Sequence, residues 1–151
     1  MRQRSILLAM LITVATWAMA DASNWTAVSS NDSTFVEYVD TNSLSIRYGQ
    51  VTALFLKNYD DPQTDGRKPY LSTKVLRMFD CSQLRVAVLS VSRYAERDAR
   101  GEVVDSMSRA PEQVILDKVQ PQSIGSTEID LVCSLWSKRL TMPFNRTLIP
   151  R

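Results

Sequence analysis

Apolar and polar residues alternate along most of the chain between residues 24 and 107, and a period of two is typical of β-strands whose faces differ. The alternating runs are rich in β-branched and aromatic residues, which favour extended structure. Short segments with glycine, proline, asparagine and aspartate separate the runs. We therefore expect strands over 24–30, 34–40, 50–59, 70–81, 84–95 and 102–107, with a short extended piece at 44–48.

The connections between these runs have turn and loop chemistry. Residues 60–69 contain two prolines, a glycine and five charges, so we expect a loop there. Residues 98–101, Asp-Ala-Arg-Gly, suit a type I turn with Gly101 in the left-handed conformation. Segment 108–118 is ambiguous, because its pattern fits either a short strand or irregular structure.

The stretch 122–138 has the period of a helix. Its single apolar stripe consists of Ile129, Val132, Cys133, Trp136 and Leu140. The polar residues that could cap its N-terminus are Ser123, Ser126, and Thr127 together with Asp130. Residues 139–151 contain two prolines and have no clear period, so we expect a loosely ordered tail.

Consecutive strands followed by one late helix predict an α+β fold: an antiparallel meander of about six strands with a C-terminal helix packed on one face. The two cysteines fit this arrangement. Cys81 ends the 70–81 strand and Cys133 lies in the helical stripe. Since cysteines of exported proteins usually pair, we predict a Cys81–Cys133 disulfide that ties the helix to the sheet. Two free thiols are the alternative.

Strand parity indicates which residues face the helix. If Cys81 points toward the helix, Val75 and Phe79 do so as well, and we expect Val51, Phe55 and either Val86 or Val88 to join them. Apolar residues also occur at the opposite parity, which one helix cannot cover. Loops, the tail, a second copy of the chain in a homodimer, or another partner could cover that face. The candidate partner-facing residues are Leu54, Leu56, Leu76, Met78, Leu89 and Val91.

The N-terminus has the pattern of a secretory signal peptide over residues 1–20. Two arginines precede an apolar run, and Ala18-Met19-Ala20 fits a cleavage site. The run covers about a dozen residues, fewer than the ~20 that a membrane-spanning helix needs. An uncleaved signal anchor is the alternative. No cysteine follows the cleavage site as in a lipobox, so we expect a periplasmic or secreted protein with a domain over 21–138 and no membrane span after cleavage.

Removal of residues 1–20 changes the charge of the chain. The full sequence has 18 lysines and arginines and 16 aspartates and glutamates. Arg2 and Arg4 leave with the signal, so 18 − 2 = 16 bases face 16 acids. A formally neutral domain has no basic excess to neutralise phosphates, which disfavours nucleic-acid binding.

The residues that most enzymes use are missing. The chain has no histidine, which removes the commonest general base and zinc ligand. No glycine-rich phosphate loop is present, and the cysteines do not form a C-x-x-C motif. We therefore expect neither catalysis nor a cofactor or metal site. An enzyme that uses two carboxylates facing each other in a cleft is the alternative.

A series of short motifs resembles one known family. In order they are Trp25-x-x-Val28, Tyr38-Val39-Asp40-x-x-Ser43, Gly49, Leu56-x-x-Tyr59, Tyr70-x-Ser72-x-Lys74, Phe79-Asp80-Cys81, Tyr94, Gly101-x-Val103-Val104, Pro121-x-Ser123 and Leu131-Val132-Cys133. This order resembles the bacterial surface-adhesin protein E family. The chain departs from it by lacking the lipobox cysteine and by having Leu116 where relatives often have tryptophan.

The resemblance implies a six-stranded antiparallel sheet with a disulfide-tied C-terminal helix. It also implies an adhesin that binds host extracellular-matrix and serum proteins such as laminin, vitronectin and plasminogen. We therefore expect an exported, non-enzymatic binding protein. The alternative is a periplasmic envelope accessory protein whose partner belongs to the bacterium itself.

Overall fold

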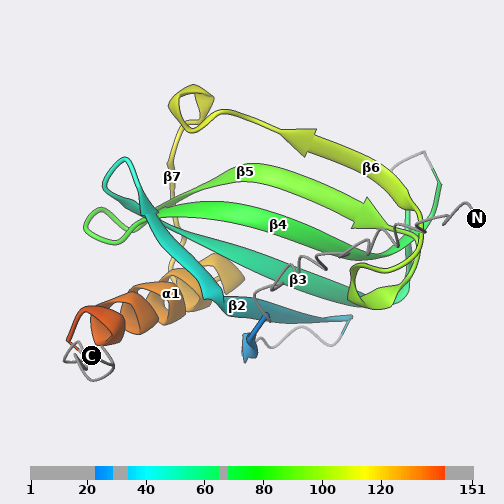
Figure 1. Ribbon diagram of the computed structural model, residues 1–151, viewed down its shortest axis with the longest axis horizontal. Coiled ribbons are helices and arrows are strands. Elements are labelled where there is room, and N and C mark those ends of the chain that lie inside the picture. The colour runs from blue at the N-terminus through cyan, green and yellow to red at the C-terminus, as the bar shows by residue number, and fades with distance from the viewer. Residues whose placement is uncertain (1–22, 29–33, 65–67, 142–151) are drawn as a thin grey trace, which may run out of the picture.

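The computed structural model describes residues 23–28, 34–64 and 68–141, and within them the chain forms one twisted sheet with a helix against one face (Figure 1). Two single-turn 3-10 helices, η1 and η2, lie in the connections. The elements are β1 (Trp25–Val28), β2 (Phe35–Arg47), β3 (Gln50–Gln63), β4 (Tyr70–Asp80), β5 (Arg85–Tyr94), η1 (Arg97–Ala99), β6 (Val103–Ser108), η2 (Pro111–Gln113), β7 (Asp117–Lys118) and α1 (Ile124–Thr141).

The sheet is an antiparallel meander in the order β1-β2-β3-β4-β5-β6, and β7 also pairs with β5. Strand β5 pairs with β6 along its second half and with β7 at Arg85 and Val86. This confirms the predicted α+β fold. It also resolves the ambiguous segment 108–118 into η2 and the two-residue strand β7.

Strands β2 and β3 are longer than the sequence pattern predicts. The expected break between 34–40 and 44–48 is instead a register shift within β2, between Asp40 and Ser45. Strand β3 continues to Gln63, so residues 60–63 are strand where we expected loop. Pro62 is tolerated because it lies between Asn58 and Gln63, where the pairing with β4 is interrupted.

The turn at η1 differs from the predicted type I turn. Gly101 has the expected left-handed conformation, with φ +75°, but Asp98 and Ala99 are also left-handed. Hydrogen bonds with the sheet account for this conformation. The amide N–H of Asp98 donates to Asn58 Oδ1 at 2.8 Å, and that of Ala99 donates to Ser72 Oγ at 3.0 Å.

The hydrophobic core lies between α1 and the sheet. Ile129 and Val132 of the helix stripe are buried against strand residues that include Val51, Phe55 and Phe79. Cys133 and Trp136 are partly buried against the same cluster, as is Val86, whereas Val88 is 36% exposed. Leu140 does not join the stripe, because its side chain is 67% exposed near the end of the helix.

The ends of α1 are fixed by polar contacts. Ser123 is the residue that caps the N-terminus, since its Oγ accepts a hydrogen bond from Ser126 N at 3.2 Å. The helix continues through Thr141, so residues 139–141, which we expected in the tail, are helical. Arg139 Nη1 donates to Leu44 O on β2 at 3.0 Å. Residues 1–20 and 142–151, to which we assigned the signal peptide and the tail, lie outside the described residues.

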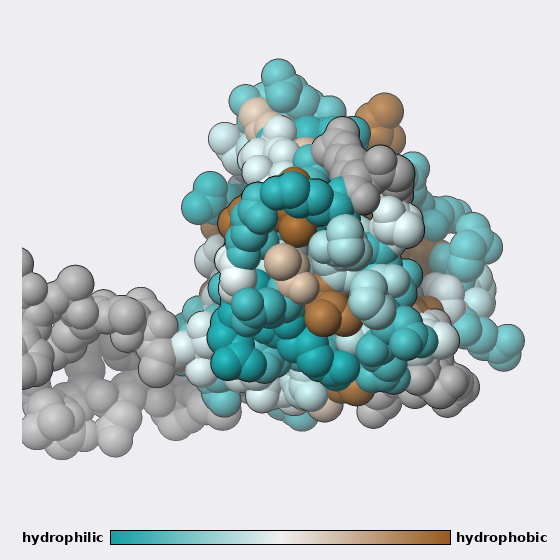
Figure 2. All heavy atoms as spheres, turned by 90° about the vertical axis from the view of Figure 1, so that its right-hand side faces the viewer, coloured by the Kyte–Doolittle hydropathy of each residue, from teal (hydrophilic) through white to brown (hydrophobic). Residues whose placement is uncertain are grey.

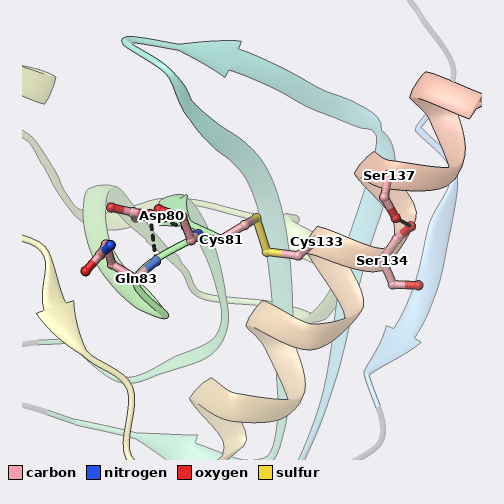
Figure 3. The surroundings of a disulfide bond; sticks show 7 residues. Asp80, Cys81, Gln83, Cys133, Ser134 and Ser137 are labelled. Carbon is pink, nitrogen blue, oxygen red and sulfur yellow. Dashed lines mark hydrogen bonds between the residues drawn. A yellow bond between two sulfur atoms is a disulfide. The ribbon is translucent and has the colours of Figure 1, made fainter.

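The predicted disulfide is present. Cys81 and Cys133 are bonded, with a Cα–Cα distance of 5.8 Å, and the bond joins the end of β4 to the middle of α1 (Figure 3). The two cysteines are 52 positions apart in the sequence. The bond therefore closes a long loop around β5, β6 and β7 and holds the helix at its position on the sheet.

Candidate functional site

Most of the candidate partner-facing residues share the sheet face opposite α1. Leu54 and Leu76 are directly paired across β3 and β4, at the parity opposite to that of the core residues Phe55 and Val75. Leu54 and Leu76 are half-buried, whereas the accessible fractions of the other members are small: Leu56 5%, Met78 3% and Leu89 4%.

Val91 lies on the other face, so its assignment to this surface is wrong. The pairing of β4 and β5 shifts where Leu76 opposes Ser90 and Arg77 opposes Val88, which leaves Leu89 as an extra residue. A β-bulge of this kind reverses the parity of the residues that follow it. Val91 consequently pairs with Val75 and packs against the core beneath the helix.

The η1 turn covers one end of this opposite face. Asn58 and Ser72 have the same parity as Leu54 and Leu76, and both are buried. Asn58 Nδ2 donates to Asp98 Oδ1 at 2.7 Å, and Ser72 Oγ donates to the carbonyl of Glu96. Part of the face is therefore occupied by the chain itself, through polar contacts that the sequence pattern did not indicate.

A buried charged cluster lies on the helix side of the sheet. Arg77 on β4 contacts two carboxylates: its Nη1 is 3.1 Å from Glu37 Oε1 on β2 and 2.9 Å from Glu128 Oε1 on α1. The guanidinium also lies over the ring of Phe55, 4.6 Å from its centroid. Lys57 Nζ is 3.9 Å from Glu37 Oε1. The cluster therefore joins three strands to the first half of the helix.

Two carboxylates that share one nearby guanidinium cannot both be ionised at low cost. Burial raises the pKa of Glu128 to about 8, while the charge of Arg77 opposes the rise and the neighbouring Glu37 adds to it. Glu37 Oε2 is buried and has no hydrogen-bond partner among the described residues. Glu128 is thus a protonated carboxylic acid at neutral pH.

This pair does not form the open carboxylate site that an enzyme would need. The side chains of Glu37 and Glu128 are 0% and 5% exposed, so no substrate can reach between them. Within the described ranges there is also no group of three or more residues that could hold a metal ion. The arrangement can fix the helix on the sheet and respond to proton concentration, but it offers no reaction path.

The sequence pattern indicated separately that each member of this cluster lies at or next to an inward-facing position. Arg77 has the inward parity of Val75 and Phe79, and Glu37 alternates with the inward residues Phe35 and Val39. Glu128 directly precedes Ile129 of the helix stripe. A charged residue at a buried parity requires a partner of opposite charge. Parity alone, however, could not say which strand supplies which partner.

An aromatic series continues across the helix-side face beyond the charged cluster. Phe35 and Tyr59 rings are 6.1 Å apart, and Tyr59 and Tyr70 rings are 5.7 Å apart, both in edge-to-face geometry. Lys57 Nζ lies 3.9 Å from the centre of the Phe35 ring. Burial raises the pKa of Tyr59, with Thr73 acting in the opposite direction through a hydrogen bond. These aromatic contacts continue the side-chain packing on this face of the sheet beyond the charged cluster.

Comparison with known proteins identifies a family and a fold. The family model described as Surface-adhesin protein E matches residues 25–134. The solved structure of protein E from non-typeable Haemophilus influenzae has a TM-score of 0.55 and 12% identity, and the match covers 80% of this chain and 82% of that chain. Crystal form II of Haemophilus influenzae protein E gives a TM-score of 0.53 at 12% identity, covering 67% and 82%. Comparison with curated proteins finds no match.

Proposed function

The chain belongs to the surface-adhesin protein E family, and we propose on this basis that it is an exported, adhesin-like protein that binds a protein partner without catalysing a reaction. The match over residues 25–134 supports the proposal most strongly, because it includes every strand among the described residues and the helix as far as the disulfide. The closed carboxylate pair and the lack of histidine agree with a non-enzymatic role.

Export is the second part of the proposal. The signal-like pattern of residues 1–20 and the disulfide both fit an oxidising compartment outside the cytoplasm. None of the helices among the described residues is long and apolar enough to cross a membrane. We expect the protein, expressed with its N-terminal segment in a Gram-negative host, to be recovered as a form that begins near Asp21. Intact mass measurement distinguishes this form from an uncleaved chain.

The partner that we propose is a host matrix or serum protein. Surface plasmon resonance of the exported, purified protein over immobilised laminin and vitronectin tests this, with serum albumin as the reference surface. Saturable binding to one of the two, absent on albumin, is the expected result. Failure of the folded protein to bind either one contradicts the adhesin proposal.

A periplasmic accessory role is the second candidate, because the Cys81–Cys133 disulfide fits an oxidising periplasm as well as the cell exterior. In that case the partner would be a component of the bacterial envelope. Fractionation separates the two: protein confined to the periplasm favours the accessory role, and protein on the cell surface or in the medium favours the adhesin.

A further inference from the structure

The connection between β6 and β7 leaves the edge of β5 uncovered over a short distance. Arg109 N donates to Leu89 O at 2.8 Å, where β6 ends. Asp117 pairs with Val86 where β7 begins, so the connection is attached to β5 at both of its ends. Between these two points the chain forms the 3-10 helix η2, which lies away from β5 (Figure 1). Neither β6 nor β7 therefore pairs with Val88.

The backbone groups of Val88 face this opening. In an antiparallel sheet, the N–H and C=O groups of successive residues point alternately toward the two neighbouring strands. Leu84 O accepts from Val119 N at 3.0 Å on the side of β7, so the groups of Val86 and Val88 point to that side as well. Among the described backbone groups, Val88 consequently leaves one donor and one acceptor unpaired at the edge of the sheet.

A hollow with a volume of about 310 Å³ lies at this opening. We call it the edge hollow and define it by Arg77, Val88, Arg109, Val114, Ile115 and Asp117, which line it. Its apolar part is accessible, since Val88 is 36% exposed and Ile115 is 82% exposed. Sites for small molecules typically have volumes of about 300–1,000 Å³, so a ligand of this hollow belongs at the small end of that range.

Two of the three charged side chains in the edge hollow are free to bind a ligand. Arg77 is already paired with Glu37, and its side chain is 14% exposed. Arg109 and Asp117 are exposed, and within the described residues neither has an ion-pair partner. The hollow thus offers one unpaired cation and one unpaired anion beside an apolar wall.

The connection that borders the hollow is formally neutral. Glu112 and Lys118 are also exposed along it, so two bases, Arg109 and Lys118, face two acids, Glu112 and Asp117. A neutral site with both signs of charge gives no net attraction to a purely anionic or purely cationic ligand. It favours a ligand that is itself neutral and carries one charge of each sign.

The opposite end of the sheet has a different surface. Figure 2 faces that end, where the described surface is mostly hydrophilic. Arg100 Nη2 there is 3.2 Å from Asp98 Oδ2, so these two charges already satisfy each other. A ligand that binds through one cation, one anion and an apolar group therefore fits the edge hollow better than that end.

We propose that the edge hollow binds a small zwitterion of the amino-acid class, either a free aliphatic amino acid or a dipeptide. The carboxylate of the ligand binds Arg109, and its ammonium group binds Asp117, through charge-assisted hydrogen bonds. Its aliphatic side chain packs against Val114 and Ile115, and the unpaired groups of Val88 bind its polar atoms. This site is additional to the proposed adhesion and does not rest on it.

Analogues that lack one charge test the proposal on the wild-type protein. The exported, purified protein, labelled with ¹⁵N, is titrated with L-leucine and with L-leucyl-L-leucine and followed by NMR. Saturable binding of at least one of them, with a shift of the Val88 amide signal, is the expected result, and the tighter ligand identifies the source as an amino acid or a peptide. The N-acetylated form and the C-terminal amide of that ligand should each bind at least tenfold more weakly.

Two substitutions should remove these two preferences separately. Asp117→Asn should weaken binding of the unmodified ligand at least tenfold and leave binding of its N-acetylated form unchanged. Arg109→Gln should have the same effect on the unmodified ligand and leave binding of the amide unchanged. Both side chains are exposed, so neither change should alter the urea midpoint. Glu112→Gln is the matched control on the same connection, and its Kd should stay within twofold of wild type.

Three results would overturn the edge hollow as a binding site. The first is the lack of saturable binding of both leucine and leucyl-leucine at millimolar concentration. The second is equal affinity of wild type for the unmodified ligand and for its acetylated and amidated forms, which decides the question even if a variant is less stable. The third is unchanged affinity in both Asp117→Asn and Arg109→Gln. Binding to laminin and vitronectin is measured separately and stands or falls by itself.

Discussion

At the scale of single residues, Arg77 is the central member of the buried charged cluster. Its guanidinium lies between Glu37 and Glu128 and over the Phe55 ring. Since ion pairs formed in the interior must overcome the loss of hydration, such a cluster is weak evidence of added stability. Removing one member is costly, however, because the remaining charges stay buried. The free energy of unfolding therefore depends on each of these three charged residues and on pH.

The first prediction concerns pH. The pKa of Glu128 rises from its ordinary value of 4.5 to about 8 in the folded protein, mainly because the side chain is buried. Between these values the folded state keeps a proton that the unfolded chain releases, so the free energy of unfolding falls as pH rises, by up to about 1.4 kcal/mol per unit. Glu128→Gln should flatten the profile between pH 5 and 8 in urea titrations.

Asp130→Asn is the control for this prediction, because Asp130 is exposed on the same helix. It should leave the slope of the profile unchanged. A Glu128→Gln protein that keeps the wild-type slope would show that another group causes it.

The second prediction concerns Arg77→Met. This change leaves Glu37 buried without its closest cation, and breaking a buried pair in this way costs about 3–5 kcal/mol. Arg100→Met is the matched control, since Arg100 and Asp98 form an ion pair with side chains 69% and 56% exposed. Its loss should cost less than about 1 kcal/mol. Equal midpoints for the two variants in urea would contradict the assigned role of Arg77.

At the scale of elements, α1 is the part whose position has to be fixed. It follows the strands in sequence and contacts the sheet through one apolar stripe, with Ile129 and Val132 at its centre. The Cys133 bond and the Glu128–Arg77 contact attach it at two points on successive turns. The Ser123 cap and the Arg139–Leu44 contact add one hydrogen bond near each end.

The third prediction is that Cys81→Ser with Cys133→Ser leaves the protein folded but less stable. Closing a loop of this length is worth about 2–4 kcal/mol, through a smaller entropy of the unfolded chain. The urea midpoint should fall accordingly while the circular dichroism spectrum at low urea remains that of wild type. A spectrum without helical signal would instead mean that the bond is required for the helix to form.

Over the whole molecule, the sheet is more strongly connected than the helix. Strands β2 to β5 are joined by long paired ladders, whereas α1 relies on its stripe and on three local contacts with the strands and their ends, at Glu128, Cys133 and Arg139. Opening of the helix alone is therefore a lower-energy event than unfolding of the sheet. One hollow spans both parts, because Asp130 of α1 and Leu84, next to β5, both line it.

The fourth prediction follows from this difference in connection. In the double serine variant above pH 8, two of the three local contacts that hold α1 are lost or weakened, since the disulfide is absent and Glu128 loses its proton. Hydrogen exchange measured by mass spectrometry should then rise in peptides from 124–141 and stay slow in β3 and β4. Uniform acceleration across all peptides would indicate that helix and sheet unfold together.

Sequence pattern predicted much of the fold and little of the site. The period of the strands, the helical stripe at Ile129 and Val132, and the two cysteines are local signals, and they were sufficient for the meander, the helix and the disulfide. The candidate surface was less predictable, because side chains alternate regularly between the two faces of a strand only as far as a β-bulge. One extra residue at Leu89 moved Val91 to the opposite side.

The sequence by itself thus determined the order of the elements, the inward parity of β4 and the pairing of the two cysteines, because these follow from spacing along the chain. Only the tertiary structure decided which charges meet at Arg77, that Leu140 is exposed, and that Tyr48 and Leu84 lie at one end of the sheet in left-handed turns. Such features depend on register and on contacts between distant segments. A one-residue change in pairing alters them without changing the hydrophobic pattern.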